Sequence, residues 1–267
     1  MTRSDPPVPR PVAVVTGPTA GIGRVFAERL AARGHDLVLV SRDAARLRAL
    51  ADELSARHGV ACEAAAHDLA DAAAVEALAA ALAAMPRLDV LVNNAGFGTL
   101  GTLERADPAA QAAMVQLHCA TPVRLAQAAL PAMLARGAGA IVNVASVAAF
   151  VTGPGNATYS GTKAFVRLWS EGLAAEVQRR GVAVQALCPG FTRTEFHQRM
   201  GFAPTRIPAA LWLTAESVVD ASLRALDRGG PVTVVPGLRY KLAIAAVRLL
   251  PLRVFSAVVQ RGPRTRT

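Results

Sequence analysis

A tyrosine and a lysine four residues apart carry the strongest chemical signal in this chain. The 267 residues include only two tyrosines, and Tyr159 is one of them; Lys163 is one of only two lysines. Arginine provides the other 27 of the 29 basic residues, so a retained lysine indicates a position that a forked, permanently charged guanidinium cannot serve. On a helix, residues i and i+4 share a face, so the phenol and the ammonium would emerge side by side. Such a pair could exchange a proton with a bound substrate.

A serine is expected to meet this pair. The apolar run 139–145 predicts a strand that ends at Ser146, and a Gly/Pro loop connects it to the helix of Tyr159. The carboxyl ends of strands in an open α/β sheet face the ligand crevice. The Ser146 hydroxyl would therefore lie near the phenol.

A glycine-rich turn near the N-terminus is typical of a pyrophosphate site. Strand 12–16 leads into glycines at 17, 21 and 23 and then into a helix, whose N-terminus attracts an anion. Glycines alone would also suit an ordinary turn, but the strand–turn–helix order favours a dinucleotide. After the second strand, Ser41 and Arg42 stand where an acid would select NAD. They favour the 2′-phosphate of NADP(H), with a solvated Arg42 as the alternative.

Alternating apolar runs and helical patterns predict an α/β fold, a doubly wound parallel seven-stranded Rossmann-type sheet with helices on both faces. The expected strands are 12–16, 37–41, 60–66, 88–92, 139–145, 182–188 and 231–235. The expected helices are 22–33, 44–57, 72–84, 109–135, 158–180 and 215–228. We expect a flexible N-terminus at 1–10, a single Rossmann-type domain at 11–237 and a basic amphipathic extension at 238–267.

Together these motifs resemble the short-chain dehydrogenase/reductase family. The pattern comprises T-G-x-x-x-G-x-G at 16–23, Asp68-Leu69, Asn93-Asn94-Ala95-Gly96, Ser146, Tyr159-x-x-x-Lys163 and Pro189-Gly190, in the family's order over roughly residues 10–237. The resemblance implies an NADP(H)-dependent oxidoreductase that transfers hydride between nicotinamide and a carbonyl or secondary alcohol. The alternative is a dinucleotide-sensing binding protein on the same fold that has lost catalysis. The presence of both Tyr159 and Lys163 counts against that alternative.

The resemblance also implies a role for each matching residue. Tyr159 would be the general acid/base and Ser146 would hold the substrate oxygen. Lys163 and the positive nicotinamide ring would lower the phenol pKa, and Lys163 would hold the nicotinamide ribose. For Asp68, a helix N-cap before 70–84 is an alternative role. The residues implied to bind the cofactor are Gly17, Thr19, Gly21, Ile22, Gly23, Ser41, Arg42, Asp68, Leu69, Asn94, Ala95, Gly96, Tyr159, Lys163, Pro189, Gly190 and Thr192.

One position departs from the family pattern. Relatives usually carry Asn in the helix after the N-N-A-G strand, where this chain has His118. In relatives the main-chain carbonyl of that residue holds a water of the proton relay. Pro122, four residues further on, has no N–H, so the His118 carbonyl would stay free for such a water. The His118 imidazole is itself a candidate catalytic group, and packing is the alternative.

The segment after Thr194 predicts an apolar cover over the substrate. If its side chains face the site, a fatty acyl, steroid-like or aromatic ketone would fit; alternatively they only pack the cover onto the core. The side chains of the cover and of the opposite wall are Phe196, Met200, Phe202 and Trp212 with Phe150 and Val151.

Residues 238–267 extend beyond the family core and resemble extensions of relatives near the very-long-chain 3-oxoacyl-CoA reductases and 17β-hydroxysteroid dehydrogenases. The extension has seven basic residues and no acid. Two interpretations stay open: peripheral contact with an anionic inner membrane face, or packing on the core or on a partner subunit. The family favours a homodimer or homotetramer. The apolar positions at helical spacing are Leu238, Leu242, Ala245, Ala246 and Leu249.

Composition argues against several other classes of function. From Arg228 onward there are eight basic residues and no acid, which leaves 21 basic against 19 acidic residues elsewhere. A nearly neutral core without a recognition motif argues against nucleic acid. Three scattered cysteines without a Cys/His cluster predict neither a metal site nor a disulfide frame. The polar N-terminus lacks the apolar segment of a signal peptide, so we expect a cytoplasmic protein that acts on a small molecule.

Overall fold

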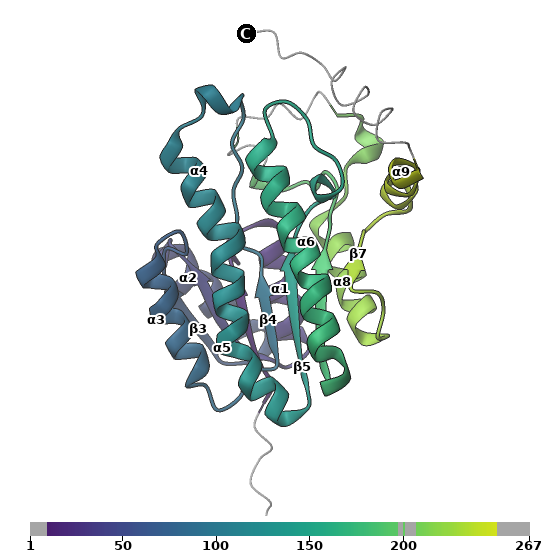
Figure 1. Ribbon diagram of the computed structural model, residues 1–267. Helices are drawn as coiled ribbons and strands as arrows, with labels where there is room; N and C mark the ends of the chain where they lie inside the picture. The colour runs from purple at the N-terminus through teal and green to yellow at the C-terminus, as the bar shows by residue number, and fades with distance from the viewer. Residues whose placement is uncertain (1–9, 197–199, 201–206, 250–267) are drawn as a thin grey trace, which may run out of the picture.

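The computed structural model describes residues 10–196, 200 and 207–249, and it has the expected α/β architecture (Figure 1). Parallel strands form one seven-stranded sheet in the order β3-β2-β1-β4-β5-β6-β7. The order reverses between β1 and β4, and a parallel sheet forms its ligand crevice at the carboxyl ends of strands on either side of such a reversal. The strands are β1 (Val12–Thr16), β2 (Asp36–Ser41), β3 (Cys62–Ala66), β4 (Val90–Asn93), β5 (Gly139–Val144), β6 (Val182–Leu187) and β7 (Thr233–Val234).

Helices cover both faces of the sheet, as the alternating pattern predicted (Figure 1). Each face is closed by a cluster of buried aliphatic side chains, so the strands are apolar on both sides. One face carries α1 (Gly21–Ala32), α2 (Ala44–His58) and α8 (Ala215–Asp227). The other face carries α3 (Ala72–Ala83), α5 (Thr121–Arg136) and α6 (Ala157–Val177).

The long helix expected over 109–135 is interrupted. It begins as α4 (Pro108–Val115), passes through a π-helical turn (Gln116–Ala120) and continues as α5. Pro122 has no N–H to donate, and the preceding Thr121 N–H bonds to the carbonyl of Gln116, five residues back instead of four. The widened turn contains His118 and directs its imidazole into the protein interior, where it is 2% exposed.

A chain of buried amides and a hydroxyl fixes α6 against the centre of the sheet. Asn93 Nδ2 on β4 donates to Asn143 Oδ1 on β5 at 2.8 Å, and Asn143 Nδ2 donates to Ser170 Oγ on α6 at 2.9 Å. Ser170 Oγ then donates to the carbonyl of Val166 at 2.7 Å. Buried hydrogen bonds are directional, so they set the rotation of α6 as well as its distance from the sheet.

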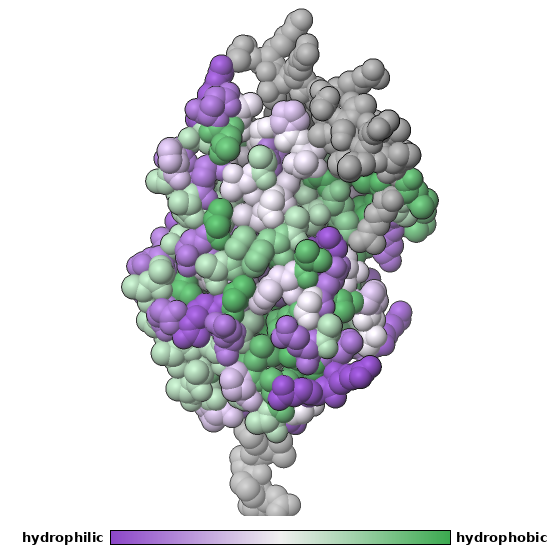
Figure 2. All heavy atoms as spheres, viewed as in Figure 1, coloured by the Kyte–Doolittle hydropathy of each residue, from purple (hydrophilic) through white to green (hydrophobic). Residues whose placement is uncertain are grey.

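The C-terminal helix α9 (Leu238–Leu249) buries a different face from the one its apolar spacing predicted. Ile244 is 9% exposed, whereas Leu238, Leu242 and Leu249 are 62–85% exposed. Figure 2 shows apolar surface at the right edge of the molecule, where Figure 1 places α9. Within the described part of the extension, packing of that apolar stripe on the core is therefore the wrong interpretation. None of the helices described here is long and apolar enough to cross a membrane. Residues 250–267 of the extension, and Phe202 of the expected cover, lie outside the described residues.

Candidate active site and dinucleotide site

The turn between β1 and α1 forms a cradle in which glycine is required. Gly17 and Gly21 have φ values of +65° and +56°, which disfavour other residues. A Cβ on Gly23 would lie 2.2 Å from the Gly17 carbonyl oxygen. α1 then begins after Ala20 without a side-chain cap, so its first N–H groups remain available to an anion. Thr19 and Ile22 lie in this turn and at its junction with the helix.

Asn94 holds the glycine-rich turn in place. Its Nδ2 donates to the carbonyls of Thr16 and Gly17 at 2.9 and 3.0 Å. Thr16 Oγ1 in turn accepts from the backbone N–H groups of Asn94 and Ala95, at 2.9 and 3.0 Å. A part for Asn94 in cofactor binding would therefore act through the turn.

Ser41 and Arg42 lie at the carboxyl end of β2, next to the turn. Ser41 Oγ is buried without a hydrogen-bond partner, which costs free energy that a ligand oxygen could recover. The Arg42 side chain is 75% exposed, with Nη1 3.8 Å from Asp68 Oδ2. Arg46 Nη1 is 3.5 Å from Glu195 Oε2. A hydroxyl and two guanidinium groups at this position fit the adenosine 2′-phosphate of NADP(H).

Asp68 does not cap a helix, so that alternative is wrong. α3 begins at Ala72, and its N-cap is Asp71, whose carboxylate accepts from the Ala73 N–H. Asp68 Oδ1 accepts from the Ala70 N–H at 3.0 Å and keeps its other oxygen near Arg42. The Leu69 side chain is buried in the core, so only Asp68 of this pair presents its side chain to solvent.

Tyr159, Lys163 and Ser146 lie together where β5 meets α6. The Ser146 hydroxyl lies near enough to the Tyr159 phenol to lower its pKa, and Ser146 Oγ accepts from the Ala148 N–H at 3.1 Å. Lys163 Nζ donates to the carbonyl of Val144, the last residue of β5, at 2.9 Å. The same Nζ is 5.7 Å from the centre of the Tyr159 ring. The three side chains predicted from spacing thus share one site.

Burial controls the protonation of this pair. It raises the pKa of Tyr159 to about 12, which the Ser146 hydrogen bond partly opposes. It lowers the pKa of Lys163 to about 8. The expectation that Lys163 lowers the phenol pKa neglected desolvation, which is the larger effect within the chain itself. A further lowering by a bound, positively charged nicotinamide stays a prediction.

His118 connects the N-N-A-G segment to the catalytic helix. Its Nε2 accepts from the Phe97 N–H at 3.2 Å, so the ring proton lies on Nδ1, 2.9 Å from Thr162 Oγ1. Burial lowers the pKa of His118 well below 6.5, and the charge of Lys163 lowers it further. The ring is therefore neutral near pH 7. Both ring nitrogens are used in bracing, which supports the packing interpretation, and a catalytic role stays a prediction.

The loop after β6 lies between Ser146 and the glycine-rich turn. Pro189 accepts from the Val147 N–H at 3.0 Å. Thr192 is buried and its hydroxyl donates to the Gly190 carbonyl at 2.9 Å. Toward the carboxamide of a bound nicotinamide, the Thr192 hydroxyl could therefore act only as an acceptor. The sequence analysis did not predict that Thr194 lies against the glycine-rich turn, where a Cβ on Gly21 would be 2.7 Å from its methyl group. Its contact with the turn depends on the path of the loop, which no local pattern specifies.

Of the expected cover residues, Phe196 reaches Tyr159 and Met200 packs beside Gly98. The ring centres of Phe196 and Tyr159 are 6.0 Å apart. A Cβ on Gly98 would lie 2.7 Å from Met200 Sδ and 3.4 Å from Phe196 Cζ. The Trp212 ring centre is 5.8 Å from that of Phe191, and Phe150 lies under the Arg167 guanidinium at 5.0 Å.

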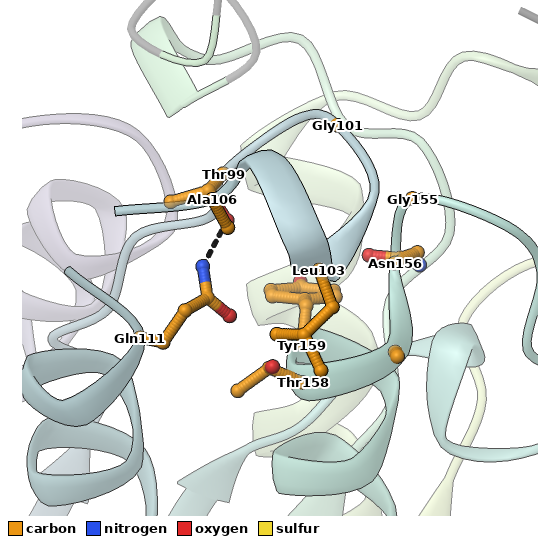
Figure 3. A pocket seen from close by; sticks show the side chains of 10 residues that line it. Thr99, Gly101, Leu103, Ala106, Gln111, Gly155, Asn156, Thr158 and Tyr159 are labelled. Carbon is orange, nitrogen blue, oxygen red and sulfur yellow. Dashed lines mark hydrogen bonds between the residues drawn. The ribbon is translucent and has the colours of Figure 1, made fainter. Parts of the chain in front are cut away.

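A small cavity, partly open to solvent, lies beside Tyr159, between the segments 99–106 and 155–159 (Figure 3). Gln111 Nε2 donates to Thr99 Oγ1 at 2.9 Å on one wall, and Asn156 Nδ2 donates to Ser160 Oγ at 3.0 Å near the other. The sequence analysis did not predict these polar walls, because Thr99 and Asn156 lie in loops and no local pattern shows that they meet Gln111 of α4. The lining residues are Thr99, Gly101, Leu103, Ala106, Gln111, Gly155, Asn156, Ala157, Thr158 and Tyr159. In the described part of the chain, no three His, Cys, Asp or Glu side chains are placed to share a metal ion.

Comparison with known proteins agrees with this geometry. The family model described as short chain dehydrogenase matches residues 11–202. A very-long-chain 3-oxoacyl-CoA reductase from Phaeosphaeria nodorum is 32% identical over 227 residues, 82% of this chain. The match spans 64% of that relative's own length.

Two solved structures resemble almost the whole chain. A short-chain dehydrogenase from Sphingobium yanoikuyae in complex with NADPH has a TM-score of 0.82 at 36% identity, covering 96% of this chain and 98% of that one. A bulky-bulky ketone specific alcohol dehydrogenase from Comamonas testosteroni has a TM-score of 0.78 at 31% identity, covering 96% of this chain and 97% of that one.

Replacing the buried Lys163 with an apolar residue should stabilise the folded protein, although it removes the ammonium group from the site. The folded-state pKa of Lys163 is about 8, below its ordinary 10.5, so below pH 8 the folded chain carries the full cost of burying the charge. We expect Lys163→Met to raise the free energy of unfolding at pH 7 by roughly 1 to 3 kcal/mol. The gain should shrink between pH 8 and 10.5, where the wild-type lysine loses its proton in the folded state but keeps it in the unfolded state.

Chemical denaturation at several pH values measures this effect, with Lys241→Met as the matched control on an exposed lysine. A Lys163→Met protein that is less stable than wild type at pH 7 would contradict it.

Proposed function

This chain belongs to the short-chain dehydrogenase family, and we propose that it is an NADP(H)-dependent oxidoreductase acting on a carbonyl or secondary alcohol. The observation that carries the proposal is the meeting of Ser146 and the Tyr159 phenol, with the buried Lys163 ammonium 5.7 Å from the phenol ring and fixed by the Val144 carbonyl. It lies at the carboxyl edge of the sheet, on the same side as the glycine-rich turn.

Each side chain would have a separate task in the reaction. The bound nicotinamide supplies or accepts the hydride. Because burial raises its pKa to about 12, the Tyr159 phenol keeps its proton at neutral pH and could donate it to a substrate oxygen during reduction. The Ser146 hydroxyl would hold that oxygen. Lys163, fixed by the Val144 carbonyl, would stabilise the phenolate that remains.

We propose an apolar substrate: a fatty acyl, steroid-like or aromatic ketone, or the matching alcohol. Phe196 and Met200 would cover its apolar part next to Tyr159. The cavity between Gln111 and Asn156 could take a polar group of the same molecule. The Comamonas relative named for bulky ketones supports this class, as does the 3-oxoacyl-CoA reductase.

Removing the phenol hydroxyl tests the acid–base role. We expect Tyr159→Phe to lower kcat by roughly 10²- to 10⁴-fold, because proton transfer to the substrate oxygen is lost, while cofactor affinity stays unchanged. Cofactor absorbance with a panel of ketones and alcohols of increasing size gives kcat, and fluorescence titration gives the affinity. Lys241→Met, at an exposed position on α9, is the control. Near-full turnover in Tyr159→Phe would show that another group transfers the proton.

Charge reversal at the end of β2 tests cofactor choice. We expect Arg42→Asp to shift the ratio of NADPH to NADH affinity toward NADH by roughly 10- to 100-fold, because it replaces a donor to the 2′-phosphate with a repelling carboxylate. Titration with both cofactors measures the ratio. Arg46→Asp is the matched comparison, since Arg46 lies in the first turn of α2, with its guanidinium beside Glu195. An unchanged ratio in Arg42→Asp with a large change in Arg46→Asp would assign the phosphate to Arg46.

We also propose a homodimer or homotetramer assembled through 109–135 and 158–180, since Leu168 on α6 is 63% exposed. Sedimentation should give two or four chain masses, and Leu168→Glu should reduce them to one, because it buries a charge in the interface.

A second variant with Ser at Leu238, Leu242 and Leu249 tests peripheral membrane contact in the same samples. Salt-sensitive flotation with anionic vesicles that this variant loses would support contact; a wild-type monomer that never floats would contradict both proposals.

A further inference from the structure

The second tyrosine of the chain, Tyr240 on α9, bridges two segments of the candidate site. Its hydroxyl accepts from the Phe191 N–H at 2.9 Å and donates to the Leu211 carbonyl at 2.6 Å. Phe191 follows Pro189-Gly190 in the loop after β6, and Leu211 ends the short helix (Ala209–Leu211) that follows the cover segment. One phenol therefore connects the loop, the cover and the C-terminal helix.

The hydroxyl stands in place of a missing sheet hydrogen bond. Residues 191–193 and 213 form a short parallel ladder, in which the Leu213 N–H donates to the Phe191 carbonyl at 2.8 Å and the Arg193 N–H donates to the Leu213 carbonyl at 2.9 Å. The next rung of a parallel ladder would join the Phe191 N–H to the Leu211 carbonyl. These two groups bond to opposite sides of the Tyr240 hydroxyl instead, so the strands are held apart by one oxygen atom.

The Tyr240 ring also accounts for the glycine at position 190. A Cβ on Gly190 would lie 2.0 Å from Tyr240 Cζ, so no larger residue fits while the ring is in place. Further along the helix, Ile244 is 9% exposed, and Arg239 Nη1 donates to the Ala210 carbonyl at 2.7 Å. The buried face of α9 is thus directed at the loop and the cover, and its leucines face away.

We propose that Tyr240 is a positioning residue that sets the distance between the loop at 190–193 and the end of the cover, and through it the seat of the nicotinamide ring. The inference rests on the proposed function, because it assumes that this loop contacts the nicotinamide half of the cofactor. Without the hydroxyl, the Phe191 N–H and the Leu211 carbonyl either lose their partners or bond directly and draw the segments together. Both outcomes would displace the loop at 190–193 from the nicotinamide ring.

Separate binding of the two halves of the cofactor tests this role. The probes are NADPH and 2′-phospho-ADP-ribose, which has the adenosine and both bridging phosphates but no nicotinamide. We expect Tyr240→Phe to weaken NADPH binding by roughly tenfold, the size of a lost hydrogen-bonded bridge, and to leave 2′-phospho-ADP-ribose binding unchanged. Gly190→Ala, which displaces the ring, should give the same selective loss. Leu242→Ala, on the exposed face of the same helix, should change neither.

The outcomes separate positioning from general structure. Equal losses for both probes in Tyr240→Phe would mean that the tyrosine only stabilises the fold, and no loss for either would mean that the bridge is dispensable; either result overturns the inference. A wild-type protein that binds neither NADPH nor NADH would instead refute the proposed function, and the inference with it. If NADH is preferred, the same comparison is made with NADH and ADP-ribose.

Discussion

The burial of one ammonium group is the constraint on which the site depends. Lys163 is 6% exposed, and its one hydrogen bond described here goes to a main-chain carbonyl at the end of β5. A buried cation without a carboxylate partner is costly, and the cost appears as a pKa lowered to about 8. Burial raises the Tyr159 pKa at the same time. A negative oxygen bound next to Lys163 would lower the cost of burying the ammonium charge.

The rest of the fold fixes α6 on both halves, so that Lys163 cannot move out to solvent. Toward its C-terminal half, Asn143 joins Ser170 to the centre of the sheet. Near its N-terminal half, the neutral His118 ring is wedged against Thr162, one residue before the lysine. The π-helical turn that delivers His118 exists because Pro122 cannot donate its N–H. A residue with no polar hydrogen therefore helps to position the polar ones.

Sequence alone predicted the layers, the strand boundaries within about two residues and the meeting of Ser146 with Tyr159, because these follow from local periodicity and from the rule that strand ends converge. It missed the interruption at Gln116–Ala120. The effect of Pro122 on the His118 carbonyl was predicted, but its effect on the helix as a whole was not. The sequence analysis also left out the burial that raises the Tyr159 pKa in the chain without cofactor, because desolvation depends on neighbours distant in sequence. The polar cavity is lined by the loop at Thr99 and by helical residues such as Gln111 of α4, and a single sequence does not show that these segments meet.

The C-terminal helix shows most clearly why spacing is insufficient. The leucines at 238, 242 and 249 form an apolar stripe, yet they are exposed, and a tyrosine and an isoleucine face the body of the protein. A periodic pattern reports that a helix has an apolar face, but contact with the core is decided by which side chain finds a complementary surface. Here that surface is a glycine without a Cβ, next to two main-chain groups that lack a sheet partner. Tyr240 supplies both the flat ring and the hydroxyl that these groups require, which no leucine could do. The boundary at residue 237, drawn where the family pattern ends, therefore separates two parts that share hydrogen bonds at the site.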